Sequence, residues 1–256
     1  MEKRKSAPIW GLFYREFYPT LKELVACYAV GIALCIVFYL IKLSMEIGNL
    51  ANMSGGNLEM LKMTLPGYAI YLPGVLFMAE VNGSMSAFQF EMTPKFRCFT
   101  ASIPVSEWKF VGVKFLTSAS ILVVGILAAF LNAAIMCSIY DVAFDKTIIA
   151  NLLLCAVGVS IVCAGLYLFN YLFRSPMAAV IAYLVVMYGV VIGWMVPHFE
   201  EIEQLATENE MDAVSLILED ITDFSTAFLP FSVPCIIAVL WLGWVLCALL
   251  AKRREK

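Results

Sequence analysis

The sequence predicts an all-α integral membrane protein with six transmembrane helices. The chain is 62% hydrophobic and only 14% charged, whereas globular domains carry about 25% charged residues. Its apolar residues collect in runs that reach the roughly 20 residues needed for a helix to cross a bilayer. The alternating ten-residue segments typical of a membrane β-barrel are absent, so helices, which satisfy their own backbone hydrogen bonds, are the expected spanning elements.

Before the first span, residues 8–23 combine apolar and charged side chains at helical spacing. The apolar stripe consists of Trp10, Phe13, Phe17 and Leu21, while Arg15, Glu16 and Lys22 occupy other faces. This pattern predicts an amphipathic elbow helix lying in the membrane interface. Pro19 predicts a bend or break near Tyr18, where the elbow meets the first span. A flexible basic tail is the alternative interpretation.

Six apolar runs define the predicted spans, at about 24–41, 66–90, 115–140, 148–173, 177–197 and 227–250. The third and fourth runs contain no charge, whereas Glu80 interrupts the second, with Asn82 two residues later. A carboxylate at that depth is costly and usually faces a bundle interior or a cavity. Glu80 and Asn82 are therefore candidate pathway residues, although a protonated Glu80 that links helices is an equal alternative.

The segment 198–226, between the fifth and sixth spans, is acidic. Between residues 200 and 223 it contains neither Lys nor Arg. Two apolar stripes, one around Ile202 and one around Ile217, predict two short amphipathic helices separated near residues 207–210. A solvated acidic loop is the alternative.

The basic residues predict the orientation of the chain. If both ends and the loops after the second and fourth spans share one side, that side holds all of the 17 Lys and Arg except Lys42, Lys62 and Lys146. Positive charge accumulates on the cytoplasmic side of membrane proteins. Both termini and the loop 91–109 are thus expected in the cytoplasm. The net charge of −3 sums this basic side and the acidic outer side, and it gives no support for nucleic-acid binding.

Motifs for catalysis by this chain are missing. The sequence contains no G-x-x-x-x-G-K-[ST] phosphate loop, no H-E-x-x-H pair and no G-x-S-x-G turn, and it has a single histidine. These motifs mark nucleotide, zinc and acyl-transfer sites. We therefore expect no catalytic residues, no metal site and no cofactor on this chain.

The cytoplasmic loop 91–109 instead has the features of a docking surface. Its apolar anchors are Phe96, Phe99, Ile103, Val105 and Trp108, framed by Lys95, Arg97, Glu107 and Lys109 and divided by Pro94 and Pro104. Aromatic and arginine side chains are enriched at protein interfaces. Ser106 is the expected cap of a helix that continues into the third span. The alternative is an amphipathic stretch that rests on lipid headgroups.

The same loop resembles that of the type-2 permeases of ABC transporters. The family pattern K-x-x-x-F-x-x-S-x-P-[VI]-[ST], closed by a basic residue at the next span, is matched by Lys95, Phe99, Ser102, Pro104, Val105 and Ser106, with Lys114 as the closing residue. An N-terminal elbow, six spans and a helical excursion before the last span are also similar to the family. Met92, Thr93 and Glu107 depart from its usual charges.

This resemblance implies one permease domain over residues 1–256, in a bacterial cell membrane with both termini cytoplasmic. Such permeases pair with a second permease protomer, identical or different, and each protomer docks on a separate ATPase subunit that holds ATP and Mg²⁺. The coupling helix would lie within 91–109, with contacts from Thr93, Pro94, Lys95, Phe96, Arg97, Phe99, Ser102, Pro104 and Val105.

Members with short loops resemble exporters of amphipathic peptides, such as phenol-soluble modulins, so export of an amphipathic peptide is the expected function. Tyr28 and Phe77 join Glu80 and Asn82 as candidate pathway residues. Export of drugs or lipids is an alternative. A different class also remains open, namely an ATP-independent proton-coupled carrier or membrane scaffold centred on Glu80.

Overall fold

The computed structural model describes residues 9–46, 55–78, 106–173, 177–190, 192–193 and 213–254, and every regular element in these ranges is a helix. The helices are α1 (Ile9–Glu46), α2 (Gly55–Phe77), α5 (Glu107–Tyr140), α6 (Lys146–Leu172), a shorter helix Met177–Val190, and α8 (Ala213–Arg254). The predicted all-α class is confirmed for this part of the chain.

Four described helices are long and apolar enough to cross a bilayer. These segments are Thr20–Glu46, Glu107–Tyr140, Lys146–Leu172 and Ile221–Arg253. They correspond to the first, third, fourth and sixth predicted spans. The second and fifth predicted spans are described only in part, by α2 with Met78 and by the helix Met177–Val190 with residues 192 and 193. The structure therefore supports a membrane protein with four helices among its described residues that could cross a bilayer.

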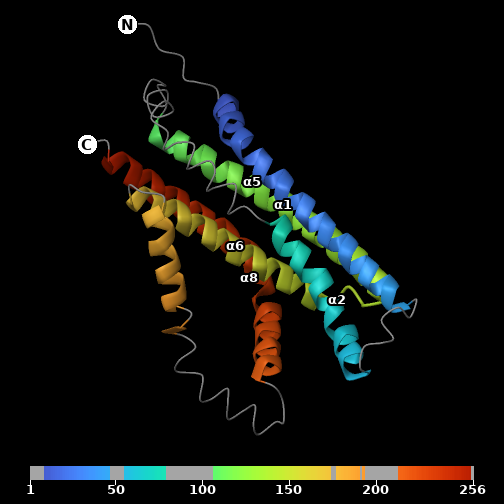
Figure 1. Cartoon of the computed structure of the whole chain (residues 1–256). Coiled ribbons are helices and arrows are strands. Elements are labelled where there is room, and N and C mark those ends of the chain that lie inside the picture. Colours follow the sequence, from blue (N-terminus) through green and yellow to red (C-terminus); the bar gives the residue numbers. More distant parts are fainter. Residues whose placement is uncertain are drawn as a thin grey trace, which may run out of the picture.

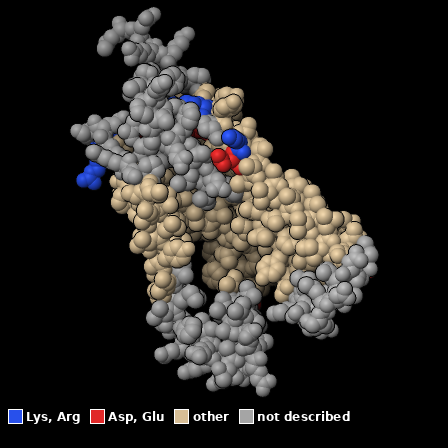
Figure 2. Space-filling model, viewed as in Figure 1, with Lys and Arg blue, Asp and Glu red and all other residues tan. Residues whose placement is uncertain are grey.

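The long helices form a bundle (Figure 1), and the first and last described helices begin and end, respectively, at the same end of it. The start of α1, the start of α5 and the C-terminal part of α8 all lie there, and we call it the termini end. On the face shown in Figure 2, the charged side chains of the described residues gather toward this end. The uncharged remainder suits the hydrocarbon core of a membrane, where charged side chains are costly.

Helices α5 and α6 form the centre of the bundle. In their most apolar 18-residue windows 44% of the residues are buried, against 17% in α1 and 22% in α8. Helix α5 contacts α1, α2, α6 and α8, and α6 packs along α8. Most of the surface of α1 and α8 therefore faces outward, toward lipid or another protein chain.

Two expected helix boundaries are not present. The elbow 8–23 and the first span form one helix, α1, which continues through Pro19, although its first turns are inclined to the remainder (Figure 1). Likewise, the described part of the segment 198–226 is the beginning of α8 rather than a separate helix. At Pro19 the expected bend is present and the expected break is not, since a helix can accommodate a proline by bending. At the second boundary the apolar residues on each side allow the helix to continue.

Helix α8 is bent, as Figure 1 shows, and Pro230 and Pro234 lie inside it. A proline inside a helix removes one backbone hydrogen bond and its ring pushes against the preceding turn, which kinks the helix. The hydroxyl of Ser232 donates a hydrogen bond to the carbonyl oxygen of Leu229 at 2.6 Å, so one carbonyl in this bent region has a partner.

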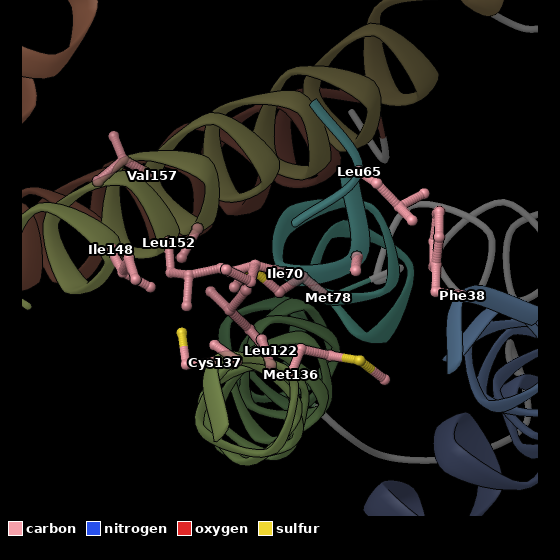
Figure 3. Close-up of a cluster of buried hydrophobic side chains, with 14 of the residues drawn as sticks. Phe38, Leu65, Ile70, Met78, Leu122, Met136, Cys137, Ile148, Leu152 and Val157 are labelled. Atoms are coloured by element: carbon pink, nitrogen blue, oxygen red, sulfur yellow. The ribbon is translucent and has the colours of Figure 1, made fainter. Parts of the chain in front are cut away.

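The main apolar cluster lies where α1, α2, α5 and α6 meet (Figure 3). Leu152 of α6 and Leu122 of α5 are almost fully buried there, at 0% and 2% exposed. Close approach depends on small residues. A Cβ atom added to Gly125 would lie 2.4 Å from the backbone oxygen of Phe77, so only glycine at this position allows α2 to pack so closely on α5.

Two asparagines, the buried Asn132 and the partly buried Asn151, link the helices. The side-chain amide of Asn132 in α5 donates to the carbonyl oxygens of Ala69 at 3.4 Å and Ile70 at 3.3 Å, and its Oδ1 accepts from the thiol of Cys35 in α1 at 2.8 Å. Pro73 has no N–H for the carbonyl of Ala69, four residues earlier, so Asn132 supplies the donor that the proline removes.

Asn151 of α6 makes the second link. It donates to the hydroxyl of Tyr71 in α2 at 3.2 Å and accepts from the hydroxyl of Ser225 in α8 at 2.6 Å. The sequence predicts such interhelical hydrogen bonds for Asn132, Asn151 and Asn170. The structure confirms them for Asn132 and Asn151, whereas the buried Oδ1 of Asn170 has no hydrogen-bond partner among the described residues.

Candidate functional site

The predicted coupling residues lie outside the described part of the chain. This holds for Thr93, Pro94, Lys95, Phe96, Arg97, Phe99, Ser102, Pro104 and Val105, and also for the pathway candidates Glu80 and Asn82. Their roles stay predictions. The structure does describe the point at which the loop enters α5, from Ser106 onward, and the helices that surround it.

The other two pathway candidates, Tyr28 and Phe77, are brought together. Their ring centroids lie 5.7 Å apart. Phe77 is only 6% exposed, and its ring occupies the space beside Gly31, where an added Cβ would come within 2.7 Å. Within the described residues, Phe77 thus packs α2 against α1, and Tyr28 is half-buried beside it.

Helix α5 begins directly after the predicted coupling loop. Ser106 is its N-cap, as expected, with extended backbone angles of φ −71° and ψ 144°, but its side chain makes no capping hydrogen bond. The carbonyl oxygen of Ser106 accepts from the backbone N–H groups of Lys109 at 2.9 Å and Phe110 at 3.0 Å. Glu107 places a negative charge in the first turn, which favours the positive end of the helix dipole.

A buried ionic cluster joins the start of α1 to the first turns of α5. The carboxylate of Glu16 pairs with the guanidinium of Arg15 at 2.6 Å and with the ammonium of Lys114 at 3.4 Å. The side chains of Glu16 and Lys114 are only 5% and 2% exposed. Both cations also lie near the ring of Phe110, Arg15 at 4.9 Å and Lys114 at 5.3 Å from its centroid. This burial makes the pair sensitive to the loss of either partner.

A tryptophan pair joins the same turns of α5 to α8. The indole nitrogen of Trp244 donates to the carbonyl oxygen of Trp108 at 3.1 Å, and the two rings pack edge to face with centroids 6.0 Å apart. Gly112 provides space for this contact, because an added Cβ would lie 3.2 Å from the indole nitrogen of Trp244. We call the residues Arg15, Glu16, Trp108, Phe110, Lys114 and Trp244 the α5 junction.

Helix α1 is also attached to α5 at the opposite end of the bundle. Lys42 donates to the carbonyl oxygen of Ile139 and pairs with Glu46 at 3.3 Å and with Asp141 at 3.9 Å. The hydroxyl of Tyr140 donates to the carbonyl oxygen of Phe38 at 2.8 Å. Ion pairs and hydrogen bonds therefore join α1 to α5 near both ends of the bundle.

The α5 junction is a set of ionic, hydrogen-bond and aromatic contacts between three helices. It contains one carboxylate, two cations and aromatic rings that are in contact with one another. Among the described residues, no group of three or more His, Cys, Asp or Glu side chains is placed to hold a metal ion. These contacts fix the position of the first turns of α5 relative to α1 and α8.

The buried pairing of Glu16 with Lys114 was missed at the level of sequence, where Glu16 was expected on a polar face of the elbow. Helical periodicity reports only the faces of one helix, and a pairing between distant segments is not visible in it. One signal does point to it: Lys114 follows the apolar residues Val111 and Val113 and directly precedes a charge-free run. A cation at that position needs a carboxylate at a similar membrane depth.

Comparison with known proteins adds no assignment: no protein-family model matches the chain, and neither a curated protein nor a solved structure matches it. The class that the described residues define is a helical membrane protein with four helices able to span a bilayer.

Proposed function

We propose that this chain is the transmembrane subunit of an ATP-driven ABC exporter, with ATP hydrolysed by separate ATPase subunits. The family resemblance of the loop 91–109 provides the assignment, and the contacts that attach the α5 junction to α1 and α8 support it. In this proposal the loop docks on an ATPase subunit, and movement of that subunit is passed to the membrane helices.

The supporting observation is that the exit of the loop is attached to two other helices. Within the first turns of α5, Lys114 pairs with Glu16 of α1, and the backbone of Trp108 accepts from Trp244 of α8. Helix α5 is 34 residues long and contacts α1, α2, α6 and α8. A displacement that reaches Ser106 would therefore act on α5 and on the helices that it contacts.

The exposed surface of α1 supports a second permease protomer in the complex. Large apolar side chains such as Val25, Ile32 and Ile36 are each at least half exposed, at 60%, 54% and 54%. In a membrane such a surface contacts lipid or another helix. We propose that part of it packs against the second protomer, so that the pathway forms between the two protomers and not within one chain.

The proposed substrate is an amphipathic peptide, drawn from the membrane and released on the outer side. This choice follows the resemblance to peptide-exporting permeases. Drugs and lipids are the alternative substrates for the same machinery, since they share an apolar surface that enters from the bilayer.

Co-purification with an ATPase tests the proposal. The full-length chain would be produced with ABC ATPase subunits from its own genome, beginning with any that is encoded beside it, and isolated in detergent. We expect a stable complex that is lost in the double variant Phe96→Ala/Phe99→Ala. The matched control is Tyr14→Ala/Tyr18→Ala, which removes two exposed aromatic rings from α1 and is expected to keep the complex.

Failure of folded wild-type protein to bind any of these ATPases would refute the assignment. The rival carrier predicts a different pattern. Transport by the purified chain alone, abolished by Glu80→Gln and unaffected by Phe96→Ala/Phe99→Ala, would establish an ATP-independent carrier in its place.

A further inference from the structure

An apolar groove between α5 and α8 opens on the surface of the bundle near the termini end. It has a volume of about 230 Å³ and is lined by Gly112, Phe115, Leu116, Leu240, Trp241 and Trp244. Phe115 is buried at 5% exposed, whereas Leu116 and Trp241 are 50% and 56% exposed. The last two residues therefore form the open rim, one from each helix. We call this feature the α5/α8 groove.

Two exposed lysines, Lys109 and Lys252, lie on the same sides of these helices as the rim. Lys109 precedes Leu116 by seven residues, so it is rotated from Leu116 by only about 20° around α5. Lys252 follows Trp241 by eleven residues and is likewise rotated by about 20° around α8. Both lysines are displaced from the groove toward the termini end, by roughly 10 Å and 16 Å along their helices.

Three other charged side chains of the described part of α5 and α8 are directed elsewhere. Arg253 is rotated by about 180° from Trp244 around α8, and Glu107 by about 140° from Gly112 around α5. Lys114, which follows Gly112, is buried in its pair with Glu16. Each rim residue therefore has one lysine on the same side of its helix, toward the termini end: Lys109 for Leu116 and Lys252 for Trp241.

This arrangement selects an amphiphile with an anionic head. A neutral lipid would fill the groove but make no charged contact with Lys109 and Lys252. A soluble anion would contact the lysines but leave the apolar surface of Leu116 and Trp241 uncovered. Basic sites between transmembrane helices bind anionic lipid headgroups, and tryptophan side chains are enriched at the level of the headgroups.

We propose that the α5/α8 groove is a binding site for one anionic phospholipid. An acyl chain lies in the groove against Phe115, Leu116 and Trp241, and the phosphate lies between Lys109 and Lys252. The bound lipid would cover the tryptophan pair of the α5 junction from the membrane side. This inference requires only that the chain spans a membrane and does not depend on the proposed transport function.

Quenching of tryptophan fluorescence by brominated lipids tests the site. The full-length protein would be reconstituted in phosphatidylcholine vesicles that contain phosphatidylglycerol, with bromine on the acyl chains of one lipid at a time. The chain has five tryptophans, and Trp241 at the rim is the reporter. We expect brominated phosphatidylglycerol to quench at lower mole fraction than brominated phosphatidylcholine, and we expect Trp241→Phe to remove most of the difference between the two lipids.

The lysine variants test the headgroup contact. Lys109→Ala and Lys252→Ala are each expected to weaken the preference for phosphatidylglycerol by about fivefold, and the double variant by about thirtyfold. The control is Lys22→Ala, which removes an exposed lysine from α1 and is expected to keep the preference. Circular dichroism would verify that each variant is folded.

Four results would overturn the proposal. Equal quenching of the wild type by the two brominated lipids would exclude a site selective for anionic lipid. Unchanged selectivity in the folded Lys109→Ala/Lys252→Ala variant would exclude these lysines as the headgroup contact. Relief of quenching by millimolar inorganic phosphate would identify a free-anion site, and absence of quenching at Trp241 would indicate that another protein chain covers the groove.

Discussion

Replacement of Glu16 by Gln tests whether the buried ionic cluster holds the start of α1 on α5. The change keeps the size of the side chain and removes the negative charge that both Arg15 and Lys114 contact. It leaves Lys114, which is 2% exposed, with a neutral neighbour in place of its carboxylate. We therefore expect a marked loss of stability without a change in the helical content of the folded state.

The distance between the two charges sets the magnitude. At 3.4 Å and an effective dielectric constant of about 20, the attraction is about 5 kcal/mol, part of which offsets the cost of removing both groups from water. Removal of one partner of a buried pair costs about 3–5 kcal/mol. We expect this loss for Glu16→Gln and for Lys114→Met, and a loss well below their sum for the double variant.

Unfolding of the purified protein in mixed detergent micelles, titrated with sodium dodecyl sulfate, would measure these free energies. Glu46→Gln is the matched control, because Glu46 also pairs with a lysine, Lys42 at 3.3 Å, but is 57% exposed. An exposed pair contributes little, so the control is expected to change stability by less than about 1 kcal/mol.

Two outcomes would refute the reasoning. If Glu16→Gln costs no more than Glu46→Gln, the carboxylate of Glu16 is not buried against Lys114. If the losses of Glu16→Gln and Lys114→Met simply add in the double variant, the two residues act independently and the cluster does not join α1 to α5.

Two further predictions concern packing and hydrogen bonding within the bundle. Gly125→Ala is expected to cost more than about 2 kcal/mol, because the new Cβ would lie 2.4 Å from the backbone oxygen of Phe77, whereas Gly158→Ala meets nothing within 4 Å and is expected to leave the unfolding transition unchanged or raised. Tyr183→Phe is expected to be neutral or slightly stabilising, because its buried hydroxyl has no hydrogen-bond partner among the described residues. Tyr140→Phe removes a 2.8 Å bond and is expected to cost about 1 kcal/mol. The same detergent titration checks all four variants, and a Tyr183→Phe loss as large as that of Tyr140→Phe would contradict the second expectation.

Composition and periodicity were sufficient to predict an all-α membrane protein and the approximate positions of four of its spanning helices. These properties are local: a run of apolar residues with no charge has to cross the bilayer as a helix, wherever the rest of the chain lies. The polar residues Asn132 and Asn151 were also predictable as interhelical links, because an amide in hydrocarbon needs a partner. The positions of the coupling residues and of Glu80 stay predictions from the sequence.

Helix ends and the partners of buried groups required the tertiary structure. Pro19 indicated a possible boundary, yet α1 continues through it, because packing against neighbouring helices can outweigh one lost backbone hydrogen bond. Glu16 appeared to lie on a polar face until α5 placed Lys114 beside it. The alignment of Lys109 and Lys252 over one groove likewise exists only because α5 and α8 pack together. A sequence shows which polar or charged side chains of each helix need a partner away from lipid. Which residue becomes that partner depends on contacts between segments far apart in the chain.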